Sequence, residues 1–351
     1  MVRYEISRTP GPAEWDQFVD AHPDGRFAHL TAYHRVLADT YHLRVFTLAF
    51  FIGNQLCGLL PCVRIPGVAS QPKLVSMPFS DYGGLLAGEG ISLPYEAVRH
   101  GLAALLRESD TRYLEIHGPC MYDGPAPGKE LFTERKDCLF ATLPLTTIKE
   151  VENRIDQSVR KNLRRARESN LIVRNDSSES AIRKDFYPLY LRAMKHFGTP
   201  PHALDYFCAM KRHMGDRIRL FIATSGERVV SVLWGIASSS RLHICYTASA
   251  GNSLQMRPSD LVHWEMITWA IEHGYRVFDF GVARYAGQRS FKAKWGTVFH
   301  DYNHYHYPGD ISASEIRLYT EPGILNRIWS RTVPDRLAQM IGPMIRKRLG
   351  R

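Results

Sequence analysis

The pattern of apolar and polar residues in the first third of the chain predicts helices followed by a sheet. Apolar residues recur at helical spacing over 15–21 and 31–40. Two apolar runs then flank Gly53-Asn54, a dipeptide typical of a tight hairpin turn. A helical pattern over 93–107 and the apolar segment YLEIHG complete this stretch.

A second stretch of the chain follows the same order of elements. Two apolar runs flank Gly226-Glu227, and the apolar segment LHICYTAS comes next. A helical pattern over 258–273 leads to RVFDFG, which resembles YLEIHG in its closing glycine. The repetition is one of pattern and not of identity, and it indicates an internal duplication.

Helical patterns also lie between and after the two stretches. Over 155–167, four apolar residues share one helical face while the other faces are basic. Further helices are expected over 181–196 and 204–213, before and after the breaker Gly-Thr-Pro-Pro. The tail from residue 324 onward has the pattern of an amphipathic helix, with five apolar residues in register: Leu337, Met340, Ile341, Met344 and Ile345.

Length and composition fit this division. A chain of 351 residues is too long for one ordinary core, and 44% hydrophobic with 23% charged residues is typical of a globular protein. The expected domains are a first unit over 1–150 and a second of the same plan over 151–310 with a helical insertion over about 155–213, and basic C-terminal helices over 311–351 are expected to pack on the body. No apolar run approaches the roughly 20 residues of a membrane span, and the first ten residues lack a signal-peptide core. We expect a cytoplasmic protein, with peripheral membrane contact as an alternative.

The net charge of +10 is concentrated in two segments. Residues 154–167 carry a net +5 and residues 327–351 a net +6, which leaves −1 for the rest of the chain. The body is therefore neutral, and the two segments are expected to meet anions.

Neither a disulfide framework nor a metal site is expected. The six cysteines form no C-x-x-C pair and most lie in apolar runs. His304 and His306 alternate with tyrosines in a predicted strand that also holds His300, so that His304 and His306 share a face. No carboxylate or cysteine stands near them at ligand spacing, which disfavours a metal.

Four segments together resemble the FemAB branch of the GNAT acyltransferase superfamily, over about residues 15–310. They are SMPFSDYGG (76–84), SVRKNLRRARESNLIVR (158–174), HFGTPPHALDYF (196–207) and FDFGVARYAGQRSFKAKWG (278–296). Their order and spacing are most similar to FemAB-related proteins that accompany exosortase (PEP-CTERM) exopolysaccharide systems. The resemblance implies an α/β (α+β) fold of tandem GNAT-like domains, over 1–150 and 151–310, each a mixed twisted sheet flanked by helices. It also implies transfer of an acyl group to an amine, as FemAB enzymes transfer amino acids from aminoacyl-tRNA to peptidoglycan precursors.

The chain departs from its relatives at two places. After FDFG the relatives have Arg-Ser, whereas this chain has Val282-Ala283, and Arg284 is a candidate to replace that arginine. If Gln255 is aligned with the first position of the coenzyme A signature, Pro258 stands where a glycine N–H would contact the pyrophosphate. No tightly bound cofactor is expected, and acyl-CoA and aminoacyl-tRNA both stay open as the co-substrate.

Lys292 is the leading candidate for a catalytic residue. It lies between Phe291 and Trp295, where an unpaired inward lysine would be costly. The resemblance places it at the substrate site, and the nearby basic residues could help to hold a phosphate or a developing oxyanion. The alternative is an exposed basic loop. The substrate-binding candidates around it are Asp279, Arg284, Arg289 and Trp295.

Two other segments carry candidate site residues. Asp81 is a candidate base or amine anchor, Tyr82 and Gly83 are candidate substrate-binding residues, and ordinary turn chemistry explains this segment equally well. If LHICYTAS is the splayed strand of a GNAT fold, its main chain near Tyr246 and Thr247 would face the acyl carbonyl. A packed core strand is the alternative for the Tyr246 side chain.

The basic helix is a candidate anion site. Its stripe of basic residues without interleaved aromatic residues favours contact with phosphates over reading of bases. A solvated face is an equally good explanation. The residues concerned are Arg160, Lys161, Arg164 and Arg165.

Three functions compete at this point. The first is an N-acyl or aminoacyl transferase that forms an amide on an amine of a cell-envelope or exopolysaccharide precursor, with a small-molecule or lipid-linked glycan acceptor. The second is an acyl-CoA-dependent amino-sugar N-acyltransferase. The third is an inactive GNAT pair that serves as an RNA-binding or membrane-peripheral scaffold.

Overall fold

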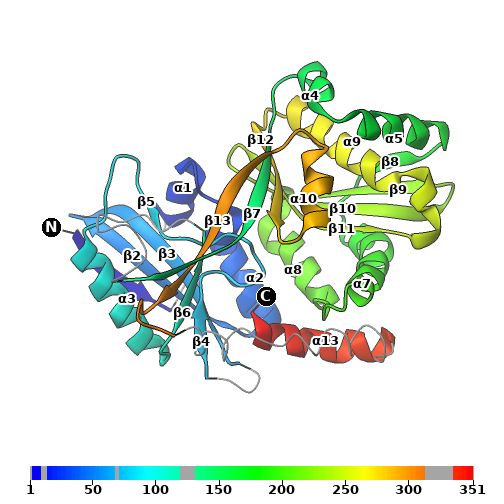
Figure 1. The fold of residues 1–351 in the computed structure, drawn as a ribbon. Helices are drawn as coiled ribbons and strands as arrows, with labels where there is room; N and C mark the ends of the chain where they lie inside the picture. Colours follow the sequence, from blue (N-terminus) through cyan, green and yellow to red (C-terminus); the bar gives the residue numbers. More distant parts are fainter. Residues whose placement is uncertain (1, 9–13, 68–70, 119–130, 313–334, 351) are drawn as a thin grey trace. The chain divides into compact units, whose positions relative to one another are not determined.

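The computed structural model describes residues 2–8, 14–67, 71–118, 131–312 and 335–350 (Figure 1). The described residues fall into two compact units. Unit 1 lies within Met1–Asp137, Tyr302–Leu325 and Met340–Arg351, and unit 2 lies within Cys138–Asp301 and Asn326–Gln339. The units therefore differ from the single-segment division expected at residue 150. Two strands, β7 (Thr133–Pro144) and β13 (Val298–Tyr307), each carry the chain from one unit into the other.

Unit 1 contains one mixed sheet. Its strands are ordered β1 (Val2–Ser7), β2 (Arg44–Ile52), β3 (Gln55–Ile65), β4 (Lys73–Val75), β6 (Leu114–His117) and β13, and β5 (Leu86–Ala87) pairs with β3. The expected hairpin at Gly53-Asn54 joins β2 and β3, and is confirmed. The neighbours β4 and β6 run parallel.

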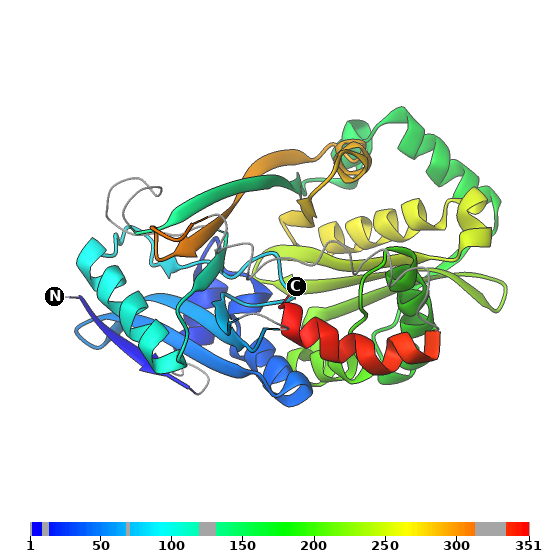
Figure 2. The same ribbon diagram turned by 60° about the horizontal axis from the view of Figure 1, so that its bottom comes forward.

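Helix α3 (Tyr95–Ser109) connects the parallel strands of unit 1 and covers one face of its sheet. Alternate residues of β2, namely Phe46, Leu48 and Phe50, are buried in a core with Leu102 and Leu105 of this helix. Helices α1 (Glu14–Ala21) and α2 (Thr31–Tyr41), joined through η1 (Phe27–His29), lie on the other side of the sheet (Figures 1 and 2). All three helices match the sequence expectation.

Unit 2 repeats the plan. Its strands are ordered β7, β12 (Val277–Ala283), β11 (Arg241–Ser249), β10 (Arg228–Ser238), β9 (Ile218–Ser225) and β8 (Ile172–Asn175). The hairpin expected at Gly226-Glu227 joins β9 and β10. Helix α9 (Pro258–Glu272) connects the parallel strands β11 and β12, as α3 connects β4 and β6. The order hairpin, strand, helix, parallel strand thus occurs twice, which is the tandem GNAT arrangement that was expected.

Helices cover both faces of the sheet in unit 2. Figures 1 and 2 show α9 and the basic helix α5 (Gln157–Glu168) on one side. Helices α7 (Tyr187–His196) and α8 (Leu204–Met214) lie on the other. The short elements η3 (Gly215–Arg217) and η4 (Gly251–Met256) precede β9 and α9.

The helical insertion differs from the sequence expectation in two details. The helix expected over 155–167 is α5, whose N-cap Asp156 accepts a hydrogen bond from the Ser158 N–H, and a separate helix that was not expected, α4 (Ile148–Arg154), precedes it. The helix expected over 181–196 begins as α6 (Glu179–Ala181) and a π-helical turn, η2 (Ile182–Phe186), before α7. Pro188 in the first turn of α7 has no N–H to bond the carbonyl four residues earlier, which favours the wider turn.

The tail forms helix α13 (Asp335–Leu349), and the part of the expected tail helix over 324–334 lies outside the described residues. The last turn of α13 contacts unit 1, where the Arg346 guanidinium lies 5.8 Å from the centroid of the Phe79 ring. Within the described residues, no helix combines the length and apolar character that crossing a bilayer requires.

Candidate functional site

Strands β11 and β12 of unit 2 separate after a short parallel pairing. They pair through three residue pairs, from Arg241 with Val277 to His243 with Asp279. Beyond this point β11 continues to Ser249 and β12 to Ala283 without further described pairing between them. This is the splayed strand pair that the sequence resemblance predicted for LHICYTAS.

A bulge in β11 lies where the strands separate. The register of β10 and β11 passes from Trp234 opposite Tyr246 to Gly235 opposite Ile244, so that Cys245 is the extra residue. Residues 244–247 are partly or fully exposed, although β11 is an interior strand of the sheet of unit 2. The extra residue of a bulge leaves the ladder of backbone hydrogen bonds locally disrupted at this position.

Gly281 forms a second bulge, on the β12 side of the splay. Its φ is 70°, a left-handed conformation, and the register of β12 with β7 shifts between Asp279 and Val282. The Asp279 carboxylate accepts a hydrogen bond of 2.8 Å from the Gly281 N–H. The Lys292 ammonium donates to the carbonyls of Gly281 at 2.9 Å and Val282 at 2.8 Å. Two buried charged groups thus fix the bend of β12.

Lys292 lies in helix α10 (Ala286–Ala293) and not in an exposed basic loop. Its side chain is buried, whereas Lys294, the C-cap of α10, is exposed. An extended segment would have placed these two lysines on the same side of the chain at a spacing of two residues, and the helix instead turns them apart. The alternative of a solvated basic loop is therefore wrong for Lys292.

Trp295 anchors the end of α10 in the core. Its ring is fully buried and lies 5.7 Å from the His263 ring and 6.0 Å from the Phe280 ring, measured between centroids. Burial lowers the pKa of His263 to about 4, with the nearby Lys292 ammonium acting in the same direction. His263 is therefore a neutral packing residue at neutral pH, and its Nδ1 atom is 2.7 Å from the Ser259 carbonyl oxygen.

Asp279 lies against Arg241 and His243 of β11. Its carboxylate is fully buried, 3.3 Å from the Arg241 guanidinium and 3.5 Å from His243 Nδ1. Arg284 and Arg289 are exposed, and the Arg284 N–H donates to the Gln288 side chain. Asp279 also accepts a hydrogen bond from the Gly281 N–H, so its carboxylate links β11 to the bulge of β12. The sequence offered one signal for this arrangement, a glycine inside an apolar strand, which is typical of a bulge.

The Tyr246 ring packs into an aromatic cluster. Its centroid is 5.3 Å from that of Phe207, 5.4 Å from Tyr190 and 6.0 Å from His202. The HFGTPPHALDYF segment therefore supports β11 from the side of α7 and α8. The Thr247 side chain, by contrast, is exposed.

The N-terminus of α9 is poorly suited to a pyrophosphate. Pro258 is its first residue and is buried, and Asp260 adds a carboxylate to the first turn. Burial raises the pKa of Asp260, and its carboxylate accepts a hydrogen bond of 3.3 Å from the Asn162 side chain. A missing N–H and an acidic side chain both weaken anion binding at a helix start.

The basic helix α5 exposes most of its charge. Lys161, Arg164 and Arg165 are exposed at positions that share a face, while Val159, Leu163 and Ala166 face the core of unit 2. Arg160 differs, because its guanidinium donates to the Ile155 carbonyl at 2.7 Å and the Glu152 carbonyl at 3.2 Å. Arg160 thus caps α4.

The remaining candidates, Asp81, Tyr82 and Gly83, belong to unit 1. A Cβ atom on Gly83 would lie 2.3 Å from the Ser76 carbonyl oxygen, so this position requires glycine. The Tyr82 ring is buried and meets Tyr302 edge to face. The Asp81 carbonyl accepts a hydrogen bond from the Tyr302 hydroxyl at 2.5 Å. Close packing against the Ser76 backbone therefore accounts for Gly83, and a role of Asp81 in catalysis stays a prediction.

Comparisons with known proteins agree with this architecture. Residues 153–293 match the family model of the acetyltransferase (GNAT) domain. No curated protein sequence matches the chain. The crystal structure of FemX is similar over 89% of this chain and 98% of its own, with a TM-score of 0.63 and 13% identity.

Two further solved structures are similar over nearly their whole length. L-PGS from Bacillus licheniformis aligns with 93% of this chain and 99% of its own, with a TM-score of 0.54 and 13% identity. A tandem GNAT protein from the clavulanic acid biosynthesis pathway aligns with 88% of this chain and 100% of its own, with a TM-score of 0.52 and 14% identity. At these identities the likeness establishes the fold, and the chain therefore has the fold of tandem GNAT proteins.

Proposed function

We propose that this protein is an acyltransferase that forms an amide on an amine of a cell-envelope or exopolysaccharide precursor, with aminoacyl-tRNA as its donor. The observation that carries the proposal is the splay of β11 and β12, whose described pairing ends at His243 and Asp279, together with the buried Lys292 ammonium at the bend of β12. The GNAT family match over residues 153–293 and the likeness to FemX and L-PGS support the reaction class.

The reaction requires stabilisation of charge at one carbonyl. The acceptor amine attacks the ester carbonyl carbon, and the oxygen of the resulting tetrahedral intermediate becomes negative. When the intermediate collapses, the new C–N bond is kept and the C–O bond to the tRNA ribose breaks. The amine loses a proton, and the ribose oxygen gains one. Main-chain N–H groups of β11 near Tyr246 and Thr247 would stabilise the oxyanion, and such preorganised donors contribute about 3–4 kcal/mol.

Lys292 supports this site through Gly281 and Val282. Its two bonds to their carbonyls stabilise the bend of β12. The buried positive charge also favours negative charge nearby, because screening is weak in a dry environment. Lys292 is accordingly a positioning residue with an electrostatic contribution.

The choice of donor rests on two features of unit 2. The start of α9, with Pro258 and Asp260, disfavours the pyrophosphate of coenzyme A. The exposed stripe Lys161, Arg164 and Arg165 on α5 favours a long polyanion. An acyl-CoA donor and an inactive scaffold are the competing functions.

Mass spectrometry distinguishes the three functions. The purified protein is incubated with an amine-bearing envelope precursor and either aminoacyl-tRNA or acyl-CoA, and the acceptor is analysed for a new amide. Amide formation with aminoacyl-tRNA supports the proposal. Amide formation only with acyl-CoA would show that acyl-CoA and not aminoacyl-tRNA is the donor. Binding of tRNA without amide formation from either donor would favour the inactive scaffold.

A further inference from the structure

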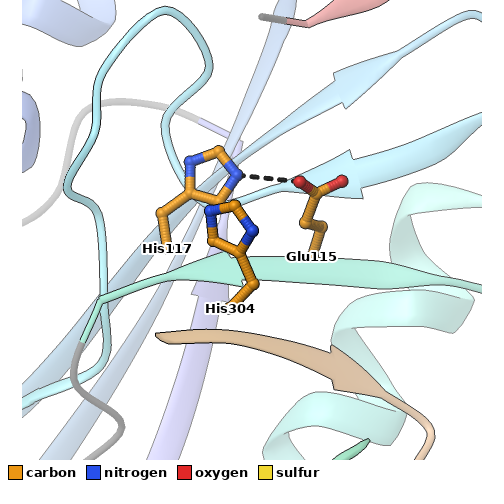
Figure 3. Close-up of side chains that lie close together, drawn as sticks. All are labelled: Glu115, His117 and His304. Carbon is orange, nitrogen blue, oxygen red and sulfur yellow. Dashed lines mark hydrogen bonds and ion pairs between the residues drawn. The ribbon is translucent and has the colours of Figure 1, made fainter. Parts of the chain in front are cut away.

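Three ligand-type side chains converge on one face of the sheet in unit 1. Glu115 and His117 are two residues apart on β6, so they point to the same face of the strand. His304 of β13 is the direct cross-strand partner of His117. One potential ligand atom from each of these three buried residues lies within 4.8 Å of the other two (Figure 3).

The distances suit a small cation bound by nitrogen and oxygen. His117 Nε2 is 3.0 Å from Glu115 Oε1, and the His117 and His304 ring centroids are 4.7 Å apart. Two ligands of a tetrahedral zinc ion, with bonds of about 2.0–2.2 Å, lie roughly 3.3 Å apart. Small adjustments of the side chains would therefore bring the three ligands around one ion.

The surrounding groups orient the two imidazoles as metal ligands are commonly oriented. His117 Nδ1 is 3.3 Å from the Ser80 carbonyl, and His304 Nε2 is 3.1 Å from the Tyr302 hydroxyl. With Nδ1 as the donor to Ser80, a neutral His117 presents its Nε2 lone pair to the Glu115 carboxylate. A cation between these two acceptors satisfies both. Support of the second ring nitrogen by a carbonyl or similar group is typical of metal-bound histidine.

Lys73 is the competing partner of the carboxylate. Its buried ammonium lies 2.9 Å from Glu115 Oε2 and leaves Oε1 directed at His117. A hydrogen bond to the second oxygen of a ligating carboxylate is compatible with metal binding. The positive charge nevertheless opposes a cation, so that Lys73 should weaken the site without abolishing it.

We propose that Glu115, His117 and His304 form a binding site for one divalent zinc ion. Two imidazoles and one carboxylate are a zinc ligand set, with a water molecule as the fourth ligand. The sequence argument against a metal was that no carboxylate or cysteine stands at ligand spacing from these histidines along the chain. The fold supplies Glu115 from a strand nearly 190 residues away in the sequence. Because of this separation, the three ligands cannot be recognised from local sequence spacing.

The ion would brace the SMPFSDYGG segment that carries Asp81. The Ser76 hydroxyl accepts from the His117 N–H at 2.7 Å, and the Gly83 N–H donates to the His117 carbonyl at 3.0 Å. Tyr302 connects His304 to the Asp81 carbonyl. Metal binding at this site therefore fixes the segment, whether or not the chain transfers an acyl group.

Metal content of the full-length protein tests the proposal. The protein is stripped with a chelator, incubated with Zn²⁺ alone, dialysed and analysed by elemental mass spectrometry. Co²⁺ is titrated in parallel to detect the visible absorption of a tetrahedral site. We expect about one Zn²⁺ per chain and a rise in melting temperature when it binds. His117→Ala and His304→Ala should each weaken binding at least about 100-fold.

Matched variants separate the site from adventitious binding. His300→Ala removes an exposed histidine of the same strand and should retain the ion. Glu115→Gln alone would leave the Lys73 ammonium buried without its carboxylate partner, so this substitution is combined with Lys73→Met. The double variant should fold and should not bind the ion. Lys73→Met alone should bind more tightly than the native protein. The proposal is overturned if the native chain retains less than a tenth of an equivalent, or if the His117, His304 and His300 variants retain equal amounts.

Discussion

Lys292 and Asp279 hold Gly281 from its two sides. The Asp279 carboxylate accepts from the Gly281 N–H, and the Lys292 ammonium donates to the Gly281 carbonyl. A residue at φ 70° inside a strand needs such support, because the ladder bonds that normally hold a strand are interrupted there. The pair therefore stabilises the bulge of β12, which lies beyond the point where the described pairing with β11 ends.

We expect Lys292→Met to reduce both stability and transfer. The substitution leaves two buried carbonyls without their charged donor, which costs about 2–4 kcal/mol of unfolding free energy. If the splay carries catalysis, kcat/KM should fall roughly 30- to 1000-fold. Urea denaturation and amide formation measured on the same preparation check both effects.

Two lysine variants control this experiment. Lys294→Met changes an exposed neighbour and should stay within about 0.5 kcal/mol of the native stability. Lys292→Arg keeps the charge but not the compact ammonium, and should recover part of the activity. If Lys294→Met lowers activity as much as Lys292→Met, the segment is only generally basic and the role given to Lys292 is wrong.

The basic face of α5 should bind polyanions in a salt-dependent way. Replacing Lys161, Arg164 and Arg165 with Gln should weaken tRNA binding and lower the slope of log K against log salt by roughly 0.7–0.9 per lost contact. The melting temperature should barely change, because these side chains are exposed. Filter binding over a series of salt concentrations measures the slope.

Arg160→Gln is the matched control on the same helix. Its guanidinium bonds the carbonyls at the end of α4, so this variant should lose stability more than affinity. An unchanged salt slope in the triple variant would contradict the phosphate-contact role of α5.

His263 should make the protein less stable below neutral pH. Its pKa is about 4 in the folded protein and about 6.5 in an unfolded chain. As the pH falls, His263 therefore becomes protonated in the unfolded chain before it does in the folded protein. The free energy of unfolding is highest above pH 6.5 and decreases as the pH falls towards 4. At pH 5 this single residue should cost on the order of 2 kcal/mol.

Urea unfolding at pH 7 and pH 5 measures this dependence. His263→Phe and His263→Leu remove the titrating ring, and both should show a smaller loss between the two pH values than the native protein. Equal losses in all three proteins would mean that His263 does not contribute to the acid sensitivity.

The end of α13 should contribute to the stability of unit 1. Deleting residues 340–351 removes Arg346 from the Phe79 ring and Gly350 from its contact with Ile65. We expect the melting temperature to fall by at least about 4 °C, corresponding to a loss of 1–2 kcal/mol. Met340→Gln with Met344→Gln changes only exposed apolar side chains and should leave it nearly unchanged. Equal melting temperatures for all three proteins would instead favour a membrane role for the tail.

The sequence predicted local elements well because their causes are local. The turns at Gly53-Asn54 and Gly226-Glu227 and the helical periods of α3 and α9 lie within short windows, and all of them are confirmed. The strand geometry of DYNHYHYP was equally local, and His304 and His306 do lie on one face of β13.

What the sequence could not predict depends on contacts between distant segments. Asp279 bonds Arg241 from another strand, and Lys292 is buried by the core around Trp295. An exposed and a buried lysine look alike in a basic segment until the packing of α10 is known. The pairing of Glu115 with His304 is likewise invisible without the register of β6 and β13.

The path of β13 also affects how the chain can fold during its synthesis. Strand β6 pairs with β13, and Tyr302–Tyr307 complete the sheet of unit 1. The ribosome produces this partner roughly 190 residues after β6, a delay of about 10–40 s at ordinary elongation rates. Unit 1 is therefore not finished while unit 2 is being made, and β6 stays an open sheet edge in the nascent chain. A fragment that ends after the first half should consequently be prone to aggregation, because its unpaired edge can capture other strands.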